Sequence, residues 1–435
     1  MSVLAELAAR AHRVAADLSP GDAVATSRFV LDTVGCGVAG SGHPLAPALT
    51  RVAESLHAGD SLDARSRVAL AATFAHLDEV DAIHTGAAVL PCAPVVPVAL
   101  ELARRRPVTG AQLLAAVAAG ADVIVEAGIR LHAPTLYARG LWPAALFAPL
   151  GAAVTASLLL GQDAATSARA LALAAAGLGG LLSADELGAG HYRLLGRAAA
   201  DGLAAALSAE SGLRASLTLL DGPAAAALGQ RAGSPTALPG PHLLCAAVKM
   251  YACARPLHAA LEALDELRRR GHDPSRSATI RILLPTPTLR FVTTDKRPSG
   301  PAEAAASAVC AVAGLLADRA TDPGFFRAYD QIRATELPDV RLNGDPGLDA
   351  RYPARWGARV ELCGPHGIVA AALVDDARGG PERPWTDAQI REKFLRLAGN
   401  GWPRDEAAEW ATHCADIHRA GAGMVAEWAA GAPQP

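Results

Sequence analysis

Aromatic side chains are scarce in this sequence of 435 residues: Phe, Trp and Tyr make up 4% of it, although hydrophobic residues together make up 51%. A β-sandwich of this size would need more aromatic and β-branched residues, so the composition favours closely packed helices with many small side chains. An excess of one charge is also missing, since 40 Lys and Arg stand against 43 Asp and Glu. We therefore expect neither a nucleic-acid partner nor an anionic membrane surface.

Cysteine motifs are missing as well. The seven cysteines form no CxxC pair and no regular framework, which is typical of free thiols in a reducing compartment. Segment 1–18 has an amphipathic helical pattern without the apolar core and cleavage site of a secretory signal. The uncharged run 143–161 contains Pro149 and many small residues, which favours a buried core helix over a membrane span. The sequence thus predicts a soluble, cytoplasmic protein.

Helical periodicity runs through most of the chain, with Asp, Ser and Thr at positions typical of N-caps. The predicted helices cover 3–17, 21–41, 45–57, 63–80, 92–105, 110–130, 144–160, 163–180, 192–209 and 256–270. Alternating patterns predict a strand within 277–289 and a hairpin within 357–374, with a helix at 302–320 between them. We predict a mainly α fold: a large all-helical domain at 1–271, a smaller α+β lid domain at 272–385, and C-terminal helices at 386–435 that return to the helical domain.

The stretch FAHLDEVDAIH (74–84) gathers three carboxylates and two imidazoles in an otherwise apolar region. It could hold a metal, form an acid–base cluster, or be the solvated end of a helix. Metal ligands on a helix would stand three or four residues apart, but His76 and Asp81 are five apart, and only Asp81 and His84 share a face. Because the sequence also lacks an HExxH motif and a Cys/His cluster, we predict no metal.

An ordered series of segments gives the chain a family resemblance. The segments are LDTVGCGVAGSG (31–42), AHLDEVDAIH (75–84), PCAPVVPVALELA (91–103), AAGADVIVEAGIRL (118–131), RGLWPAALFAPLGAAVTASLLLGQD (139–163), GRAAADGLAAALSAESGL (196–213) and KMYACARPLHAALEAL (249–264). In this order they resemble the MmgE/PrpD family, which includes 2-methylcitrate dehydratase, cis-aconitate decarboxylase and an iminodisuccinate epimerase. The likeness continues through RPSGPAEAAASAV and PERPWTDAQIREKF. It implies a large helical domain with a smaller α+β lid, a homodimer, and catalysis without a cofactor or metal.

Several positions depart from the family pattern. The family's acidic motif reads roughly His-x-x-Asp-x-Asp-Asp-x-His, and here one Asp is Glu79 and another is Ala82. Leu90, Trp142 and Leu194 stand where the family carries histidines. These exchanges remove proton carriers and add apolar surface. They suggest a substrate with one acidic group and an apolar body rather than a tricarboxylate.

The resemblance also assigns the remaining acid–base groups to a site between the two domains. Glu79, Asp81 or His84 would be the base, and His191 or Tyr192 the acid. A carboxylate in apolar surroundings has a raised pKa, which suits general-base work. The alternative for the cluster is a helix end with solvated charges.

Substrate binding is expected from a second group of residues. Lys249, one of three lysines in the chain, lies in an apolar stretch, which favours a carboxylate-binding role. Arg193 follows two glycines near a predicted helix start, where backbone N–H groups can hold an anion; an ordinary helix cap is the alternative. Cys253 is interpreted as a buried small hydrophobe, since no activating partner is evident. The other expected pocket residues are Trp142, Leu90, His132, Tyr137 and His258, with a plain surface loop as the alternative for His132 and Tyr137.

These residues predict a lyase or isomerase that abstracts a proton next to a carboxyl or carbonyl group of a small-molecule substrate, with a biosynthetic role as one expectation. Two alternatives stay open. One is a conventional dehydratase or decarboxylase of a small polycarboxylate. The other is a non-catalytic small-molecule-binding or scaffold protein, which a pocket filled by Trp142 and Leu90 would favour.

Overall fold

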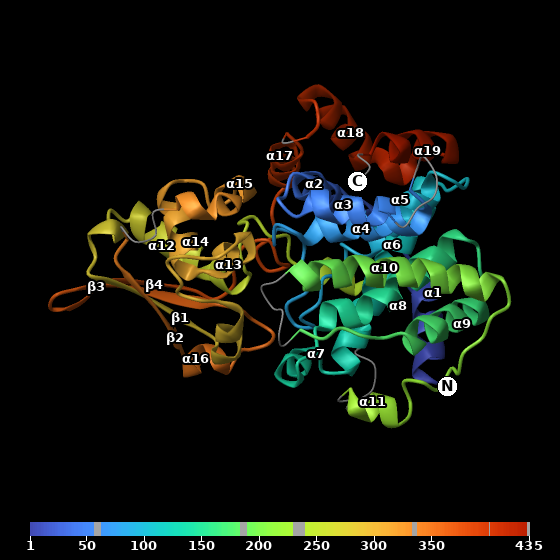
Figure 1. The fold of residues 1–435 in the computed structure, drawn as a ribbon, viewed down its shortest axis with the longest axis horizontal. Coiled ribbons are helices and arrows are strands. Elements are labelled where there is room, and N and C mark those ends of the chain that lie inside the picture. Colours follow the sequence, from blue (N-terminus) through green and yellow to red (C-terminus); the bar gives the residue numbers. More distant parts are fainter. Residues whose placement is uncertain (56–61, 183–188, 229–239, 333–336, 400, 433–435) are drawn as a thin grey trace. The chain divides into compact units, whose positions relative to one another are not determined.

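The computed structural model describes residues 1–55, 62–182, 189–228, 240–332, 337–399 and 401–432. Its internal packing divides the chain into two compact units. We call Met1–Leu77, Asp81–Ala246 and Thr386–Pro435 the helical unit, and Asp78–Val80 with Ala247–Trp385 the α+β unit. Figure 1 labels the elements of both.

The helical unit consists of helices that the sequence predicts and of two short helices, Ala133–Leu136 and Pro223–Ala227, that it does not. They are α1 (Val3–Ala16), α2 (Pro20–Ser41), α3 (Ala46–Ser55), α4 (Ala64–His76), α5 (Val95–Ala103), α6 (Gly110–Arg130), α7 (Ala133–Leu136), α8 (Pro143–Leu159), α9 (Ala164–Ala176), α10 (Ala189–Glu210), α11 (Pro223–Ala227), α17 (Asp387–Ala398), α18 (Arg404–Asp416) and α19 (Ala422–Gly431). The helix predicted at 110–130 has the bounds of α6, whereas the one predicted at 63–80 is too long, because α4 ends at His76.

Polar N-caps fix several of these starts, as the sequence predicts. The side chains of Ser19 and Asp63 accept hydrogen bonds from backbone N–H groups three residues later, at the starts of α2 and α4. Thr109 and Gln112 form a reciprocal capping box at the start of α6. Each cap satisfies donors that have no partner inside the helix, which is why the helix begins at that residue.

Helix α8 lies at the centre of the helical unit, where it packs against α5, α6, α9 and α10 (Figure 1). Nearly all of its residues are buried, so the core helix expected at 143–161 is confirmed. Among the described helices, α6 alone is long and apolar enough to cross a membrane, and 83% of its apolar window is buried inside the protein. That burial is typical of a core helix.

Glycine allows the central helices to approach closely. A Cβ atom at Gly120 of α6 would lie 1.9 Å from Thr155 Oγ1, and one at Gly151 of α8 would lie 2.4 Å from the Gly120 carbonyl oxygen. A Cβ at Gly196 of α10 would lie 2.1 Å from the Ala69 carbonyl oxygen of α4. These crossings leave no room for any side chain, which explains why so apolar a unit can form a dense core with few aromatic residues.

The C-terminal helices pack onto the N-terminal half of the helical unit. Helix α17 lies against α2, and α18 also contacts α2. Lys393 of α17 forms an ion pair with Asp32 of α2, and both side chains are fully buried. A buried charge is tolerated only with such a partner, so this pair specifies where α17 docks.

The α+β unit is built on a four-stranded sheet in the order β2-β1-β3-β4. The strands are β1 (Thr279–Leu284), β2 (Asp339–Gly344), β3 (Ala358–Gly364) and β4 (Gly367–Val374), and the helices are α12 (Pro256–Arg269), α13 (Pro301–Ala306), α14 (Ala308–Leu316), α15 (Pro323–Arg327) and α16 (Pro346–Asp349). β1 and β2 are parallel, whereas β1–β3 and β3–β4 are antiparallel. The predicted strand and hairpin correspond to β1 and β3–β4.

Two features of this unit differ from the sequence-based expectation. The helix expected at 302–320 is interrupted at Ser307, whose hydroxyl caps α14. Strand β2 was not predicted, because it is mostly exposed and shows little apolar alternation. The compact α+β unit includes α12, which packs on β3 and β4. The domain boundaries drawn from the sequence remain predictions.

Two glycines of α2 allow a direct test of the close packing. A Cβ at Gly40 would lie 1.9 Å from the Phe74 carbonyl oxygen of α4, whereas a Cβ at Gly37, one turn earlier, would meet only the Ala71 carbonyl oxygen at 4.0 Å. We expect Gly40→Ala to lower the free energy of unfolding by about 2 kcal/mol. Gly37→Ala is the matched control and should be neutral or stabilise by up to about 1 kcal/mol. Denaturant unfolding measures both, and equal stabilities would contradict the packing described.

Candidate active site

The candidate site begins where α4 ends. After His76 the chain leaves the helix, and Glu79 adopts a positive φ of 55°. His76, Asp81 and His84 are 3%, 0% and 8% exposed. The interpretation of this stretch as a solvated helix end is therefore wrong: the chain turns back and buries its charged residues instead of continuing into water.

His76 and Asp81 form a buried pair, with 2.9 Å between His76 Nδ1 and Asp81 Oδ1. An ionised Asp81 accepts the proton of Nδ1, which sets the tautomer and leaves Nε2 as the basic nitrogen of the ring. The sequence does not signal this pair, because residues five apart lie on different faces of a continuous helix. The end of α4 at His76 removes that restriction.

Three further rings surround His76 within the helical unit. The centroid of its ring lies 5.6 Å from that of Trp142, 6.0 Å from His191 and 5.3 Å from Tyr192. Trp142 is the N-cap residue of α8, and His191 and Tyr192 lie in the first turn of α10. All four side chains are at most 5% exposed. The fold thus gathers two imidazoles, a phenol and an indole from three helix ends, and we call these four residues the ring cluster.

Trp142, Leu90 and Leu194 meet beside the ring cluster. Trp142 and Leu90 belong to one hydrophobic cluster of buried residues, against which Leu194 and Tyr137 pack with partial burial. A backbone hydrogen bond holds Trp142 at the start of α8: its N–H donates to the Gly180 carbonyl oxygen at 2.8 Å. This side of the ring cluster is therefore apolar and well packed.

His84 lies in a different setting from the ring cluster. Its backbone pairs with Val89, and its Nδ1 accepts a hydrogen bond from the Ala87 N–H at 3.1 Å. Burial and the nearby charge of His242 lower the pKa of His84 from 6.5 to about 4, so the ring is neutral at pH 7. His242 Nε2 in turn lies 2.9 Å from Glu126 Oε2 in the fully buried interior, a contact that the sequence did not signal.

The α+β unit holds the rest of the acidic motif, because Asp78–Val80 packs with this unit. Glu79 Oε2 lies 3.7 Å from Lys249 Nζ, and Lys249 is 2% exposed. Asp78 pairs with Arg327 of α15, with 2.9 Å between Asp78 Oδ1 and Arg327 Nε. One carboxylate of the acidic motif thus lies beside Lys249 in this unit, and a second pairs with Arg327, a contact that the sequence does not signal.

The segment after Lys249 is densely packed. Burial raises the pKa of the Cys253 thiol to about 12, so this residue is a neutral thiol at pH 7 and not a thiolate nucleophile. His258 is buried as well, with Nε2 3.1 Å from the Cys253 carbonyl oxygen and Nδ1 3.4 Å from Arg255 Nη1. These contacts give Cys253 and His258 a packing role within the α+β unit.

Arg193 and His132, two of the expected binding residues, have different surroundings. Arg193 is exposed on α10. The first of the two glycines that precede it, residue 188, lies outside the described residues. His132 is half-buried and adopts a positive φ of 51° just before α7. The substrate-binding roles of Arg193 and His132 remain predictions.

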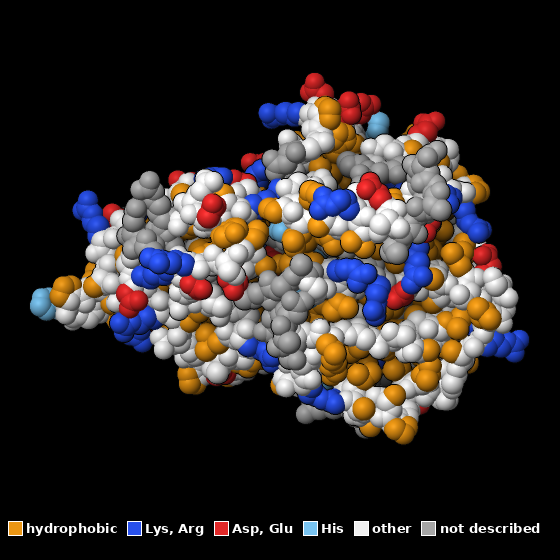
Figure 2. Space-filling view, viewed as in Figure 1, with side chains coloured by type: hydrophobic (Ala, Val, Ile, Leu, Met, Phe, Trp, Pro, Cys, Tyr) orange, Lys and Arg blue, Asp and Glu red, His pale blue; other side chains and the backbone are white. Residues whose placement is uncertain are grey.

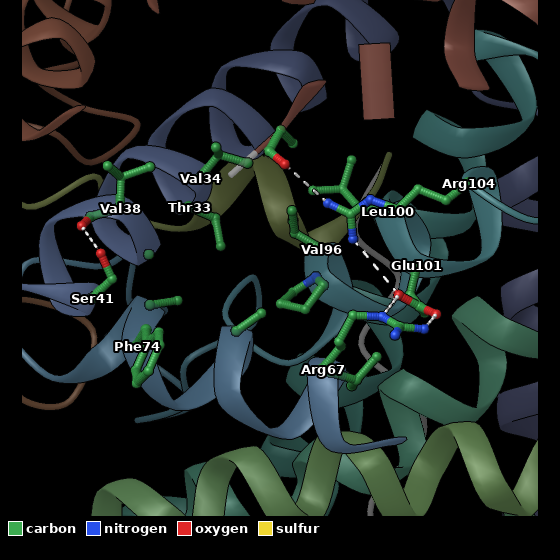
Figure 3. Close-up of a pocket in the computed structure, with 16 residues that line it drawn as sticks. Thr33, Val34, Val38, Ser41, Arg67, Phe74, Val96, Leu100, Glu101 and Arg104 are labelled. Atoms are coloured by element: carbon green, nitrogen blue, oxygen red, sulfur yellow. Dashed lines mark hydrogen bonds and ion pairs between the residues drawn. The ribbon is translucent and has the colours of Figure 1, made fainter. Parts of the chain in front are cut away.

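A separate cavity of about 60 Å³ lies between α2, α4 and α5 (Figure 3). Apolar side chains such as Val34, Val96 and Leu100 line most of it, and Glu101 with Arg67 and Arg104 forms a charged edge. The cavity is small beside the roughly 300 Å³ or more of typical ligand pockets. No residue of the predicted site lines it, and we assign it no catalytic role.

Two models of known protein families match consecutive parts of the chain. The MmgE/PrpD N-terminal domain model matches residues 5–230, and the MmgE/PrpD C-terminal domain model matches residues 251–417. The resemblance drawn from the sequence is therefore confirmed over nearly the whole chain. No curated protein matches the sequence significantly.

The lowered pKa of His84 predicts a pH-dependent stability. Between about 4 and 6.5 the unfolded chain binds a proton that folded His84 does not, so the free energy of unfolding falls as the pH drops through this range. The loss attributable to His84 is at most about 3 kcal/mol. His84→Asn keeps an acceptor for the Ala87 N–H and should flatten this dependence. Denaturant unfolding of both proteins between these pH values measures the difference, and identical slopes would contradict the prediction.

Proposed function

Since the chain belongs to the MmgE/PrpD family, which generally comprises enzymes such as dehydratases and lyases, we propose that it is a lyase or isomerase. It abstracts a proton from a carbon next to a carboxyl or carbonyl group of a small, partly apolar substrate. The expected homodimer, the cytoplasmic location, and catalysis without a cofactor or metal belong to the same proposal.

The ring cluster is the observation that carries this proposal. Buried ionisable groups in an apolar interior cost free energy, and packing alone would favour apolar side chains at these positions. Asp81 holds His76 in one tautomer, while His191 and Tyr192 place a second imidazole and a phenol beside it. Such groups can move a proton to or from a bound substrate.

Glu79 and Lys249 of the α+β unit also have roles in the proposed reaction. Glu79 is the preferred base, because its carboxylate is held by the Lys249 ammonium and is still 24% exposed. Lys249 is buried and offers a positive charge to the substrate's carboxyl group and to the enolate that forms when the proton leaves. The hydrophobic cluster of Trp142 and Leu90 favours a substrate with an apolar body.

The same cluster also supports the non-catalytic alternative, because Trp142 and Leu90 are almost fully buried and occupy space where the family has polar residues. A screen for exchange at carbon separates the two functions. Small acids with one carboxyl group and an apolar chain are incubated with the protein in D₂O, and NMR reports deuterium incorporation or elimination. A catalyst changes the spectrum of at least one acid, whereas a binding protein only broadens or shifts signals.

On a substrate found in this way, Glu79→Gln, His191→Ala and Lys249→Met should each lower kcat/KM by about 10²- to 10³-fold, because each removes a proton carrier or a stabilising charge. Thermal unfolding should show that all three proteins remain folded. Lys296→Met is the matched control, since it removes another lysine of the α+β unit and should leave the rate unchanged. Normal turnover by all three variants would show that the proposed roles are wrong.

The apolar replacements lead to a second expectation about the substrate. Purified protein should show little or no activity on 2-methylcitrate or cis-aconitate, because their several carboxylates need polar partners that Leu90, Trp142 and Leu194 do not provide. Product formation is followed by NMR, with an active 2-methylcitrate dehydratase as the positive control. Turnover of either compound at enzyme-like rates would refute the argument about the substrate while leaving the proposed proton transfer intact.

A further inference from the structure

Tryptophan, rare elsewhere, is concentrated near the C-terminus: three of the six tryptophans are Trp402, Trp410 and Trp428. Trp410 stacks on Trp428 with 4.5 Å between ring centroids, and on Phe394 with 5.6 Å. Trp402 is tilted against Trp410 at 5.7 Å. These rings lie on α17, α18, α19 and the turn before α18, all within the helical unit.

The three indoles line a pocket of about 300 Å³ formed by α18 and α19. The size is at the lower end of small-molecule pockets. Three carboxylates, those of Glu406, Glu409 and Glu427, also line it, together with His413 and Met424. Figure 2 shows acidic side chains beside hydrophobic ones over α18. We call this the C-terminal pocket, and none of the candidate active-site residues lines it.

The charged side chains that line the C-terminal pocket are mainly acidic. No Lys or Arg is among the described residues that line it. Glu406 accepts a hydrogen bond from Trp402 Nε1 at 3.3 Å, while Glu409 and Glu427 are exposed and form no ion pair with the residues that the structure describes. The negative faces of indole rings add to the field of the three carboxylates, so the pocket attracts cations and repels anions.

The indole N–H groups already donate hydrogen bonds within the protein. Trp410 Nε1 donates to the Trp428 carbonyl oxygen at 3.0 Å, and Trp428 Nε1 donates to the Trp410 carbonyl oxygen at 3.4 Å. Trp410 and Trp428 are also packed into the protein, since each residue is only 5% exposed. A ligand in the pocket therefore meets mainly the ring of the partly buried Trp402.

From these observations we propose that the C-terminal pocket binds a small organic cation of the alkylammonium class, with its charged head against Trp402 and within the field of Glu409 and Glu427. Quaternary ammonium groups are the ligands best suited to such a site, since they carry charge on an apolar surface and need no hydrogen-bond acceptor. This site is separate from the proposed catalytic function.

Choline is the probe, and its uncharged carbon isostere, 3,3-dimethylbutan-1-ol, is the matched control ligand. Each is titrated into the full-length protein at low ionic strength, with intrinsic tryptophan fluorescence and calorimetry as readouts. We expect saturable binding of choline that weakens with added salt. The neutral isostere should bind at least about tenfold more weakly, because it lacks the charge on which the cation–π contact depends.

Protein variants locate the site. Trp402→Ala should weaken choline binding about tenfold, and Glu409→Gln with Glu427→Gln about fivefold. Should Trp402→Ala unfold, the double glutamine variant tests the site alone, since both of its positions are exposed. Asp405→Asn removes another exposed acid of α18 that does not line the pocket, and it should bind choline like the wild type.

Three outcomes would overturn the proposal: no saturable choline binding by the wild type, equal affinity for choline and its isostere, or equal loss in Asp405→Asn and the double variant. Each of them would leave the proposed catalytic function unaffected, because the activity assays use a different site and a different ligand.

Discussion

The helical unit depends on how closely its helix backbones approach one another. At the crossings of α2 with α4, α6 with α8 and α4 with α10, a carbonyl oxygen or hydroxyl occupies the position that any Cβ would take. Dispersion contacts between backbones then replace those that large side chains would make. Because the helices cannot shift without colliding, their ends are held in fixed positions, and the ring cluster is assembled from such ends.

This packing also determines how charges are accommodated. An interior of Ala, Gly, Val and Leu offers no solvation, and several buried carboxylates there lie beside basic side chains: Asp32 has Lys393, Asp81 has His76, and Glu126 has His242 and Arg130. Such pairs contribute little net stability, because desolvation offsets much of their attraction. They do specify geometry, since a displaced helix would leave a buried charge alone.

Much of the fold follows from local pattern. The bounds of α6 are exact because Thr109 and Gln112 cap its start and its apolar period is unbroken, and the β3–β4 hairpin follows from alternation. The site was harder to foresee. The pairing of His76 with Asp81 depends on where α4 stops, and the pairing of Asp78 with Arg327 joins residues 249 positions apart. Strand β2 carries too few buried residues to show a pattern.

The ion pair between Asp32 and Lys393 has a consequence for the order in which parts of the protein fold during synthesis. The α+β unit is inserted between two parts of the helical unit, so α2 leaves the ribosome long before α17 exists. Until residue 393 is synthesised, Asp32 has no lysine beside it, and the face of α2 that receives α17 stays open to water. Domains generally fold as units during synthesis. Here the α+β unit can finish folding first, whereas the helical unit cannot be completed until its C-terminal helices have been translated.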